Sequence, residues 1–409
     1  MDRARTQVQR QNGVIRPVTG FRTGISLHSH TCHSKENLGF FPHYIEFLRT
    51  GFITRMVQSG LDRYREIKGK TLDFHRAYWT PPVTPEMVVA SETEQIERKL
   101  GLAALVSMTD HDTIDGPLSL QKPGASVPVP ISMEWTIPFA GNTFHLGVHH
   151  LPPDHSVEIM KALSDYTASP GDEKLRELLA FLHGSPGTLV VLNHPLQNIL
   201  RTTGPEHLAS LRELLVRCGS WIHALEVNGM RSWTENRDVL RMAEEYDMPV
   251  LAGGDRHGCR PNTVVNLSPA QTWAEFVGAI RTERQSTVLF LPAYEEPAPL
   301  RELATAGDVL RRYPDYPYGR RRFTDRIFFD LEGYGWHPIS FYLDGGNGKP
   351  GWLDPAVTAV IILGSDRLRP ILRLLFSRNG QFDHATLSPG GDGARDKLET
   401  RAEVSIKPE

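Results

Sequence analysis

The stretch "ISLHSHTCHS" (Ile25–Ser34) decides how the rest of the chain is interpreted. It places His28, His30 and His33 within six positions, behind a short apolar run, in a chain with 17 histidines among 409 residues. Successive side chains of a β-strand point to opposite faces, so His28 and His30 would share one face. Neutral imidazoles on one face can bind one metal ion, and they suit zinc, iron and manganese. The stretch therefore predicts a strand that ends at a metal site.

Outward from this stretch, short β-branched runs alternate with helical patterns. Strands are predicted over residues 24–30, 102–112, 128–135, 143–150, 188–195, 222–229, 249–257 and 286–291. Helices are predicted over residues 85–100, 172–183, 206–216, 235–245 and 270–282. An alternation of this kind indicates an α/β fold built on a parallel sheet, either open or closed into a barrel.

Three segments differ from this alternation. Residues 1–20 are polar and are expected to form a flexible N-terminal arm. The main α/β domain is expected over 21–290, with an aromatic-rich insertion at 36–82, after the first strand. Residues 291–409 form a C-terminal extension of unknown role, which includes the stretch "RRYPDYPYGRRRFTDR" at 311–326.

Composition excludes several classes of protein. The formal net charge of -3 gives no overall field for holding nucleic acid. Cys32, Cys218 and Cys259 are scattered without CxxC spacing, which fits a reducing compartment better than a disulfide framework. The longest apolar run, residues 356–364, is too short to span a bilayer. We therefore expect a cytoplasmic protein with no membrane partner, and we make no prediction of its oligomeric state.

Polar residues recur where the predicted strands end. Singly, each has an ordinary explanation, such as capping of a helix by Asp112, so the metal site is inferred from their joint pattern. The carboxyl ends of parallel strands meet on one face of the fold, which would bring these residues together. The set exceeds what one ion can bind, and two or three ions would use it, as in phosphoester hydrolysis by paired ions. Its members are His28, His30, Asp110, His111, Glu134, His145, His194, Asp255 and His257.

These motifs resemble, in order, those of the PHP (polymerase and histidinol phosphatase) superfamily. The matching pieces are "LHSHTCHS", "MTDHDTIDG", "SMEW" followed by "FHLGVHH", "LNHP" and "GGDRHG", which lie within about residues 24–290. The resemblance implies a distorted (β/α)7 TIM-like barrel with two or three divalent ions (Mn, Zn or Fe). It implies a role for Asp110 either in supporting a ligand or in binding one ion itself. The ligands that it implies are His28, His30, His111, Glu134, His145, His194, Asp255 and His257.

The sequence departs from the family pattern at one position. The family commonly has an aspartate where this chain has Lys35, with Glu36 next. Loss of an anion and gain of a cation should weaken one metal position. Three alternatives follow: Glu36 or His33 replaces the missing ligand, Lys35 itself contacts substrate phosphate, or Lys35 points to solvent.

The expected reaction is hydrolysis by a metal-activated water, with the ions absorbing charge on the phosphoryl oxygens. His194 or His257 could protonate the leaving oxygen, and Asp110 is a further catalytic candidate. Lys35, Arg231 and Arg256 are the candidates for binding an anionic substrate.

The sequence thus predicts a metal-dependent phosphoesterase acting on a small phosphomonoester of the nucleotide or nucleoside bisphosphate type. One alternative is an exonuclease that trims oligonucleotide ends, because cations beside aromatic rings at 311–326 are typical of single-strand binding. For that stretch we favour aromatic packing on the core over contact with a short nucleic acid. Further alternatives are a C–N bond hydrolase of the same fold and a non-catalytic metal-dependent scaffold.

Overall fold

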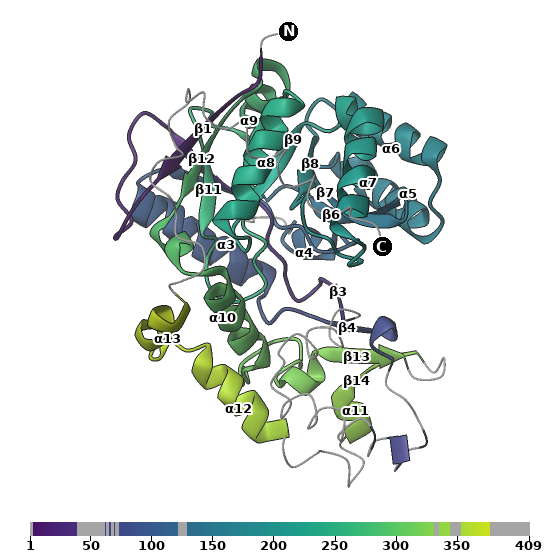
Figure 1. Cartoon of the computed structure of the whole chain (residues 1–409), viewed down its shortest axis with the longest axis vertical. Coiled ribbons are helices and arrows are strands. Elements are labelled where there is room, and N and C mark those ends of the chain that lie inside the picture. The colour runs from purple at the N-terminus through teal and green to yellow at the C-terminus, as the bar shows by residue number, and fades with distance from the viewer. Residues whose placement is uncertain are drawn as a thin grey trace, which may run out of the picture.

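In the computed structural model, the strands of the described residues form three sheets (Figure 1). The model describes residues 3–38, 73–121, 129–330, 335–343 and 353–376, together with residues 62, 65, 66 and 69. The first sheet has the order β1 (Arg5–Arg10), β12 (Gln285–Phe290), β11 (Val264–Ser268), β2 (Thr23–Ser26) and β5 (Ala103–Val106). The second has the order β10 (Val250–Gly253), β9 (Ala224–Asn228), β8 (Leu189–Asn193), β7 (Asn142–His149) and β6 (Met133–Phe139). The third has the order β14 (Trp336–Pro338), β13 (Ile327–Asp330), β4 (Ala77–Trp79) and β3 (Glu36–Asn37).

Helices follow most strands of the two larger sheets. They are α3 (Pro85–Thr93), α4 (Asp115–Ser119), α5 (Ser156–Ala168), α6 (Asp172–Gly184), α7 (Gly204–Cys218), α8 (Trp233–Glu245) and α9 (Trp273–Gly278). The C-terminal part contributes α10 (Ala298–Leu310), α11 (Ile339–Leu343), α12 (Leu353–Leu363) and α13 (Arg369–Phe376). The α3 helix begins as predicted, because the Thr84 side chain accepts a hydrogen bond from the Met87 N–H. None of the described helices is long and apolar enough to cross a membrane.

The mixed α/β architecture is confirmed, but the pairing of the strands differs from the expected parallel sheet. Strand β7 runs antiparallel to both of its neighbours, β6 and β8. Strand β11 is likewise antiparallel to both β2 and β12. The β6–β7 hairpin turns at Ala140 and Gly141, whose φ angles of 47° and 75° suit a tight two-residue turn. The strand predicted at 128–135 therefore begins later, at Met133, and continues into the hairpin.

The two five-stranded sheets meet at the end that carries the histidines. Isolated parallel bridges join His111 to Glu134 and Ser29 to Arg256, so each bridge links one sheet to the other. Among the described residues the regular pairings form separate sheets, and these two bridges connect them. The expected seven-stranded barrel therefore stays a prediction, whereas the meeting of the strand ends is observed.

The N-terminal residues are ordered by strand pairing. Residues 5–10, expected to belong to a flexible arm, form β1 and pair parallel with β12. The Thr6 and Ser286 hydroxyls lie 2.9 Å apart, and Val8 packs against the main core. The sequence of residues 5–10 does not reveal this strand by itself, because its partner β12 lies far along the chain. The proposed division at residues 20 and 290 stays a prediction.

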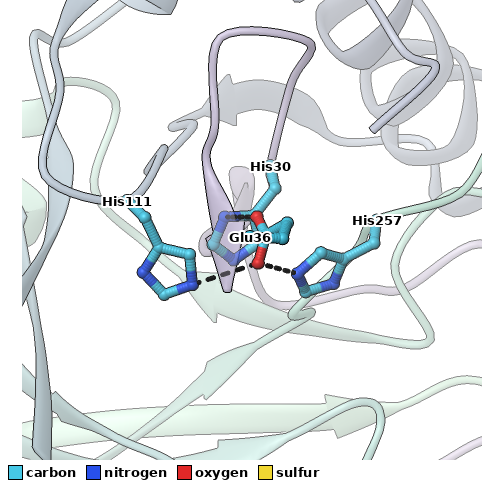
Figure 2. A group of neighbouring side chains, drawn as sticks. All are labelled: His30, Glu36, His111 and His257. Atoms are coloured by element: carbon cyan, nitrogen blue, oxygen red, sulfur yellow. Dashed lines mark ion pairs between the residues drawn. The ribbon is translucent and has the colours of Figure 1, made fainter. Parts of the chain in front are cut away.

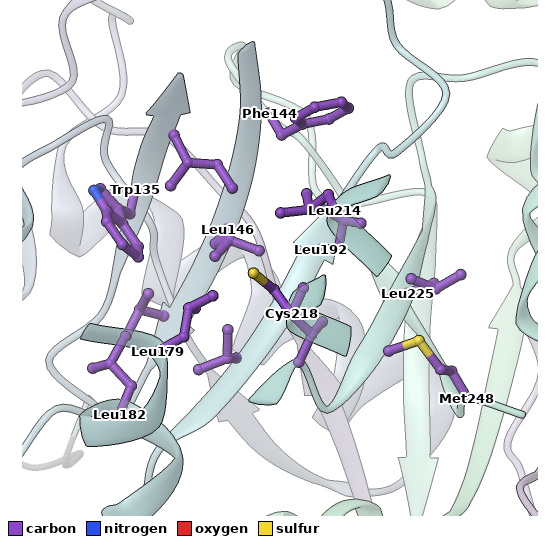
Figure 3. Packing of buried hydrophobic residues seen from close by; sticks show 14 of the residues in the cluster. Trp135, Phe144, Leu146, Leu179, Leu182, Leu192, Leu214, Cys218, Leu225 and Met248 are labelled. Atoms are coloured by element: carbon purple, nitrogen blue, oxygen red, sulfur yellow. The ribbon is translucent and has the colours of Figure 1, made fainter. Parts of the chain in front are cut away.

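The main hydrophobic core lies between the second sheet and helices α5 to α8 (Figure 3). Leu146 and Leu192 on neighbouring strands are fully buried, and Leu179 and Leu214 pack on them from α6 and α7. The indole N–H of buried Trp135 donates a hydrogen bond of 2.9 Å to the carbonyl of Leu163. This core fixes the strands from whose ends the site is built.

The third sheet unites the insertion with the C-terminal extension. Strands β3 and β4 come from the two ends of the 36–82 insertion, and β13 and β14 come from the extension. Leu38, Ala77 and Phe329 are buried together between them. The rest of the insertion falls largely outside the described residues. Figure 1 shows this small sheet together with α11 at one end of the molecule.

Asn266 provides a test of how the strands are held together. Its amide accepts from the Ala252 N–H at 2.7 Å and donates to the Ala252 carbonyl at 2.8 Å, which ties β11 to β10. Asn266→Leu leaves both buried backbone groups unpaired and should lower the free energy of unfolding by about 2–5 kcal/mol. Urea denaturation measures the loss, with Gln285→Ala on the exposed start of β12 as the control. A loss no larger than that of the control would contradict this role.

Candidate metal centre

The loop after β2 is fixed by a carboxylate from the next loop of the sheet. Asp110 is fully buried, and it accepts hydrogen bonds from the Thr31 N–H at 2.5 Å and the Thr31 hydroxyl at 2.7 Å. Gly116 allows this arrangement, because a Cβ there would lie 2.2 Å from Asp110 Oδ2. Burial raises the pKa of Asp110 to about 7. Asp110 therefore holds the backbone beside His30 and does not belong to the groups of ligand atoms described below.

Glu134 lies at the centre of the histidines. It is the second residue of β6, and only 1% of its surface is exposed. Its two oxygens lie 3.1–3.3 Å from ring nitrogens of five histidines: His28, His30, His111, His145 and His194. A carboxylate in this position can bridge ions held by different histidines.

Glu36 is a second carboxylate of the cluster (Figure 2). Its Oε2 lies 3.3 Å from His111 Nε2 and 3.1 Å from His257 Nε2, and its Oε1 lies 3.3 Å from His30 Nδ1. The Ser34 hydroxyl donates to Oε1 at 2.6 Å and accepts from the His111 N–H at 3.0 Å. Of the alternatives left open at Lys35, the structure thus brings Glu36 among the histidines.

Asp255 is the third carboxylate. Its Oδ1 lies 3.5 Å from His257 Nδ1, 3.6 Å from His30 Nε2 and 3.7 Å from His28 Nε2. The Asn228 amide donates to its Oδ2 at 3.3 Å. Three buried carboxylates therefore face one set of imidazoles.

Four overlapping groups of these side chains could hold a metal ion, each with its ligand atoms within 4.8 Å of one another. They are His30, Glu36, His111 and His257; His28, His194 and Asp255; His28, His30 and Glu134; and His111, Glu134 and His145. Because His28, His30, His111 and Glu134 each occur in two groups, the groups are partly alternatives to one another. All eight ligands implied by the family resemblance lie in these groups, and Glu36 joins them.

Backbone strain marks one of these groups. His28, His194 and Asp255 have φ angles of 62°, 28° and 54°, in the left-handed region that non-glycine residues rarely occupy. Such conformations cost about 1–3 kcal/mol each and persist where the surrounding structure holds them, often at active sites. The strain turns three side chains from three different strands toward one point.

The cluster fits metal ions on the chemistry of its own atoms. Glu134 Oε2 and His145 Nδ1 are buried and have no hydrogen-bond partner. His28 Nε2 and His30 Nε2 face each other at 3.1 Å. Buried polar atoms are normally paired, and carboxylate oxygens that converge with imidazole nitrogens form the usual donor set for zinc, iron or manganese.

Outer contacts orient the histidines. Glu226, on β9, accepts from His28 Nδ1 at 2.5 Å and from the His194 N–H at 2.8 Å. Gly253 makes room for it, because a Cβ there would lie 1.5 Å from Glu226 Oε1. His257 Nδ1 lies 2.9 Å from the Asp255 carbonyl, to which it can donate. Such contacts set the tautomer that leaves the other ring nitrogen free for a metal.

Opposite charges outweigh burial at some members of the cluster, whereas burial lowers the pKa of His30 to about 4 and also lowers that of His145. Burial alone would raise the pKa of Glu134, but His28, His111 and His145 hold it well below its usual value. Burial alone would lower the pKa of His111, but Glu36 and Glu134 raise it to about 10. Protons on histidines thus balance the carboxylates when no metal is bound, and metal ions would displace those protons.

Arg256, which was predicted to bind substrate beside His257, does not face the cluster as a free cation. Arg256 is buried; its guanidinium donates to Glu92 Oε1 at 2.8 Å, to the Ser91 hydroxyl at 2.7 Å and to the carbonyls of Gly258 and Cys259 at 2.9 Å. Because these contacts use its donors inside the fold, we withdraw Arg256 as a substrate-binding residue.

Lys35 is exposed, with its ammonium nitrogen 5.7 Å from the ring centroid of Tyr78. His33 lies outside the four groups, with its ring 5.8 Å from that of Tyr318. Both observations favour the alternative in which Glu36, rather than His33 or Lys35, compensates for the missing aspartate. Arg231, in contrast, lies at the edge of the cluster, 3.9 Å from Asp255 Oδ2.

Comparison with known proteins adds little. No family model and no curated protein matches the chain. One similar solved structure, from Bifidobacterium adolescentis, is provisionally described as a metal-dependent phosphoesterase; it is 18% identical over 44% of this chain and 85% of its own, with a TM-score of 0.29. Another is an amidohydrolase from Chromobacterium violaceum with bound sulfate and no metal; it is 12% identical over 57% of this chain and 87% of its own, with a TM-score of 0.34. Both scores are low, and neither likeness establishes the function of this chain.

The raised pKa of His111 predicts how the chelated protein responds to pH. The stabilisation that the protonated His111 ring contributes is fully present below pH 6.5, the ordinary pKa of histidine, and is lost as the pH rises through about 10. The free energy of unfolding of chelated protein should therefore fall between about pH 7 and 10, and His111→Gln should reduce this slope. Urea denaturation at fixed pH values measures both. An equal slope in the variant would contradict the assignment.

Glu36 supplies a second prediction. Glu36→Gln removes one anion from the group formed with His30, His111 and His257, so this position should bind metal about 10–100-fold more weakly. Metal titration followed by elemental analysis measures the loss. Glu213→Gln, on the exposed face of α7, is the matched control and should bind like the wild type. Unchanged affinity in Glu36→Gln would show that Glu36 is not a ligand.

Proposed function

We propose that the protein is a metal-dependent phosphoesterase that hydrolyses a phosphomonoester, of the nucleotide or nucleoside bisphosphate type. The observation that carries the proposal is the convergence of Glu36, Glu134 and Asp255 with histidines from both large sheets. Metal ions held there would polarise phosphoryl oxygens and lower the pKa of water, so that hydroxide is available near neutral pH.

The protein's own residues would handle the remaining steps. Of His194 and His257, the one that does not hold a metal ion is the candidate for giving a proton to the leaving oxygen. The His257 side chain is 17% exposed and lies beside the ring of Trp79, whereas that of His194 is 4% exposed. His257 is thus the better placed of the two to meet a substrate that enters from solvent.

Arg231 supports a phosphorylated substrate over a neutral one. Its side chain is 25% exposed, and its Nε has no hydrogen-bond partner. Its backbone carbonyl is held by the guanidinium of Arg301 at 2.6 Å and the hydroxyl of Tyr294 at 2.9 Å. A guanidinium held at the edge of a metal cluster can form charged hydrogen bonds to phosphoryl oxygens.

The Arg- and Tyr-rich stretch gives the exonuclease alternative little support. Arg326 is 1% exposed and donates to the carbonyls of Arg320 and Arg311 at 2.9 Å. Tyr316 is 4% exposed, and Arg320 is turned toward the carbonyl of Cys32. Arg326, Tyr316 and Arg320 are thus used inside the fold, whereas Arg321, Arg322 and Tyr318 of the same stretch are exposed.

The test is release of inorganic phosphate from nucleotides, nucleoside 3',5'-bisphosphates, sugar phosphates and short oligonucleotides. We expect phosphate release that chelation abolishes and added metal restores. Arg231→Met should lower kcat/KM about 10–100-fold, the equivalent of charged hydrogen bonds worth about 1.5–3 kcal/mol. Arg241→Met, an exposed partner of Asp238 on α8, should leave kcat/KM unchanged.

Two outcomes would overturn this function. Metal-loaded protein that releases no phosphate but cleaves amide or cyclic C–N substrates would instead establish a C–N bond hydrolase. Phosphate release that persists after complete removal of metal would show that the metal cluster is not the site of hydrolysis.

A further inference from the structure

A segment of the C-terminal extension, residues 308–326, reaches back to both loops that carry the metal-binding histidines. The first loop follows β2 and runs through His30 to Glu36. The second follows β10 and contains His257. In each loop a cysteine stands two residues after the histidine, Cys32 in one and Cys259 in the other. The segment contacts the backbone at both of these points.

Arg320 holds the first loop. Its guanidinium donates to the carbonyl of Cys32 at 2.7 Å and to the hydroxyl of Thr80 at 3.3 Å. The guanidinium also lies over the ring of Phe328, 5.1 Å from the centroid. The Thr80 N–H donates to the carbonyl of Arg326 at 2.9 Å, so the strand β4 is bound to the same segment. The Cys32 carbonyl is thereby fixed four residues before Glu36.

Asp308 holds the second loop. It is buried at the end of α10, and its Oδ2 accepts from the Cys259 N–H at 3.0 Å. The hydroxyl of Tyr313 donates to the Asp308 carbonyl at 2.8 Å and lies 3.2 Å from Cys259 Sγ. Gly258 permits the close approach, since a Cβ there would lie 3.0 Å from Asp308 Oδ2. The Asp308 carboxylate therefore sets the backbone just beyond His257.

The third sheet completes the connection to Glu36. Glu36 on β3 is the register partner of Trp79 on β4, and Trp79 is the partner of Ile327 on β13 of the extension. The Trp79 ring lies 5.7 Å from that of His257. Glu36 therefore reaches the histidines from a strand of only two residues. The C-terminal extension supplies the other two strands, β13 and β14, of the sheet in which β3 and β4 lie.

We propose that Asp308 and Arg320 are positioning residues of the metal centre, which set the Glu36 and His257 loops relative to each other. This inference deepens the proposed function, because it rests on metal binding by the cluster. The C-terminal extension is then a part of the centre that hydrolyses substrate, and its removal would leave the Glu36 group incomplete.

The first experiment compares metal affinity in purified full-length variants. Arg320→Met removes both polar contacts and should weaken binding of Mn²⁺ or Zn²⁺ at the Glu36 group about 10–100-fold, as losses of outer contacts do. Arg320→Lys keeps a cationic donor and should recover most of the affinity. Arg322→Met, whose guanidinium pairs with Asp325 in the same segment, should bind like the wild type. Asp308→Ala should weaken binding more than Asp308→Asn, which keeps an acceptor oxygen.

The second experiment measures hydrogen exchange in the chelated proteins, and so does not depend on metal. Arg320→Met should speed amide exchange in peptides that cover residues 31–36, and Asp308→Ala in those that cover 257–260, while peptides from β8 stay unchanged. Wild-type affinity together with wild-type exchange in both variants would overturn the proposal. A wild-type protein that binds no metal would refute the proposed function, and the exchange rates would then decide the positioning role alone.

Discussion

Burial of the Glu134 carboxylate among five histidines is the constraint on which the rest of the site depends. A buried anion is tolerated when it is paired, and protons on the imidazoles or metal ions can supply the pairing. The histidines come from the ends of β2, β5 and β8 and from β7, so the carboxylate meets all five of them only if both large sheets meet as they do. The fold and the chemistry are thus coupled through one side chain.

The structure satisfies this constraint by tying loops to one another rather than by regular sheet alone. Asp110 holds the loop at Thr31, Glu226 orients His28, and Asn266 joins β10 to β11. Glu226 also accepts from the His194 N–H, and Asn228 donates to Asp255, so side-chain hydrogen bonds reach all three residues with strained backbone. On the outer side, the third sheet brings Glu36 into the same cluster.

The sequence was informative where the decisive contacts follow a local pattern. The histidines and the other polar residues that follow apolar runs predicted the cluster. The expected strand over 24–30 was too long, because β2 ends at Ser26, so His28, with a φ of 62°, and His30 lie beyond the strand rather than on one face of it. The two-residue strand of Glu36 has no local signature, because its sheet is completed by β13, nearly 300 residues along the chain. The burial of Arg256 has no local signature for the same reason, since its partner Glu92 is 164 residues away. The β6–β7 hairpin has a weak signature in the sequence, because its turn is Ala140–Gly141 rather than the Asn-Gly or Asp-Gly pair that typically marks such turns.

The most direct test of the account is anomalous X-ray diffraction from crystals of the protein loaded with Mn²⁺ or Zn²⁺. If the Glu134 cluster is a metal centre, we expect anomalous-difference peaks within it, with zinc at about 2.0–2.2 Å from imidazole nitrogens and carboxylate oxygens. Glu134 should contact at least one ion. Absence of peaks in crystals soaked at saturating metal, or peaks confined to surface residues, would contradict the claim that this cluster is a metal centre.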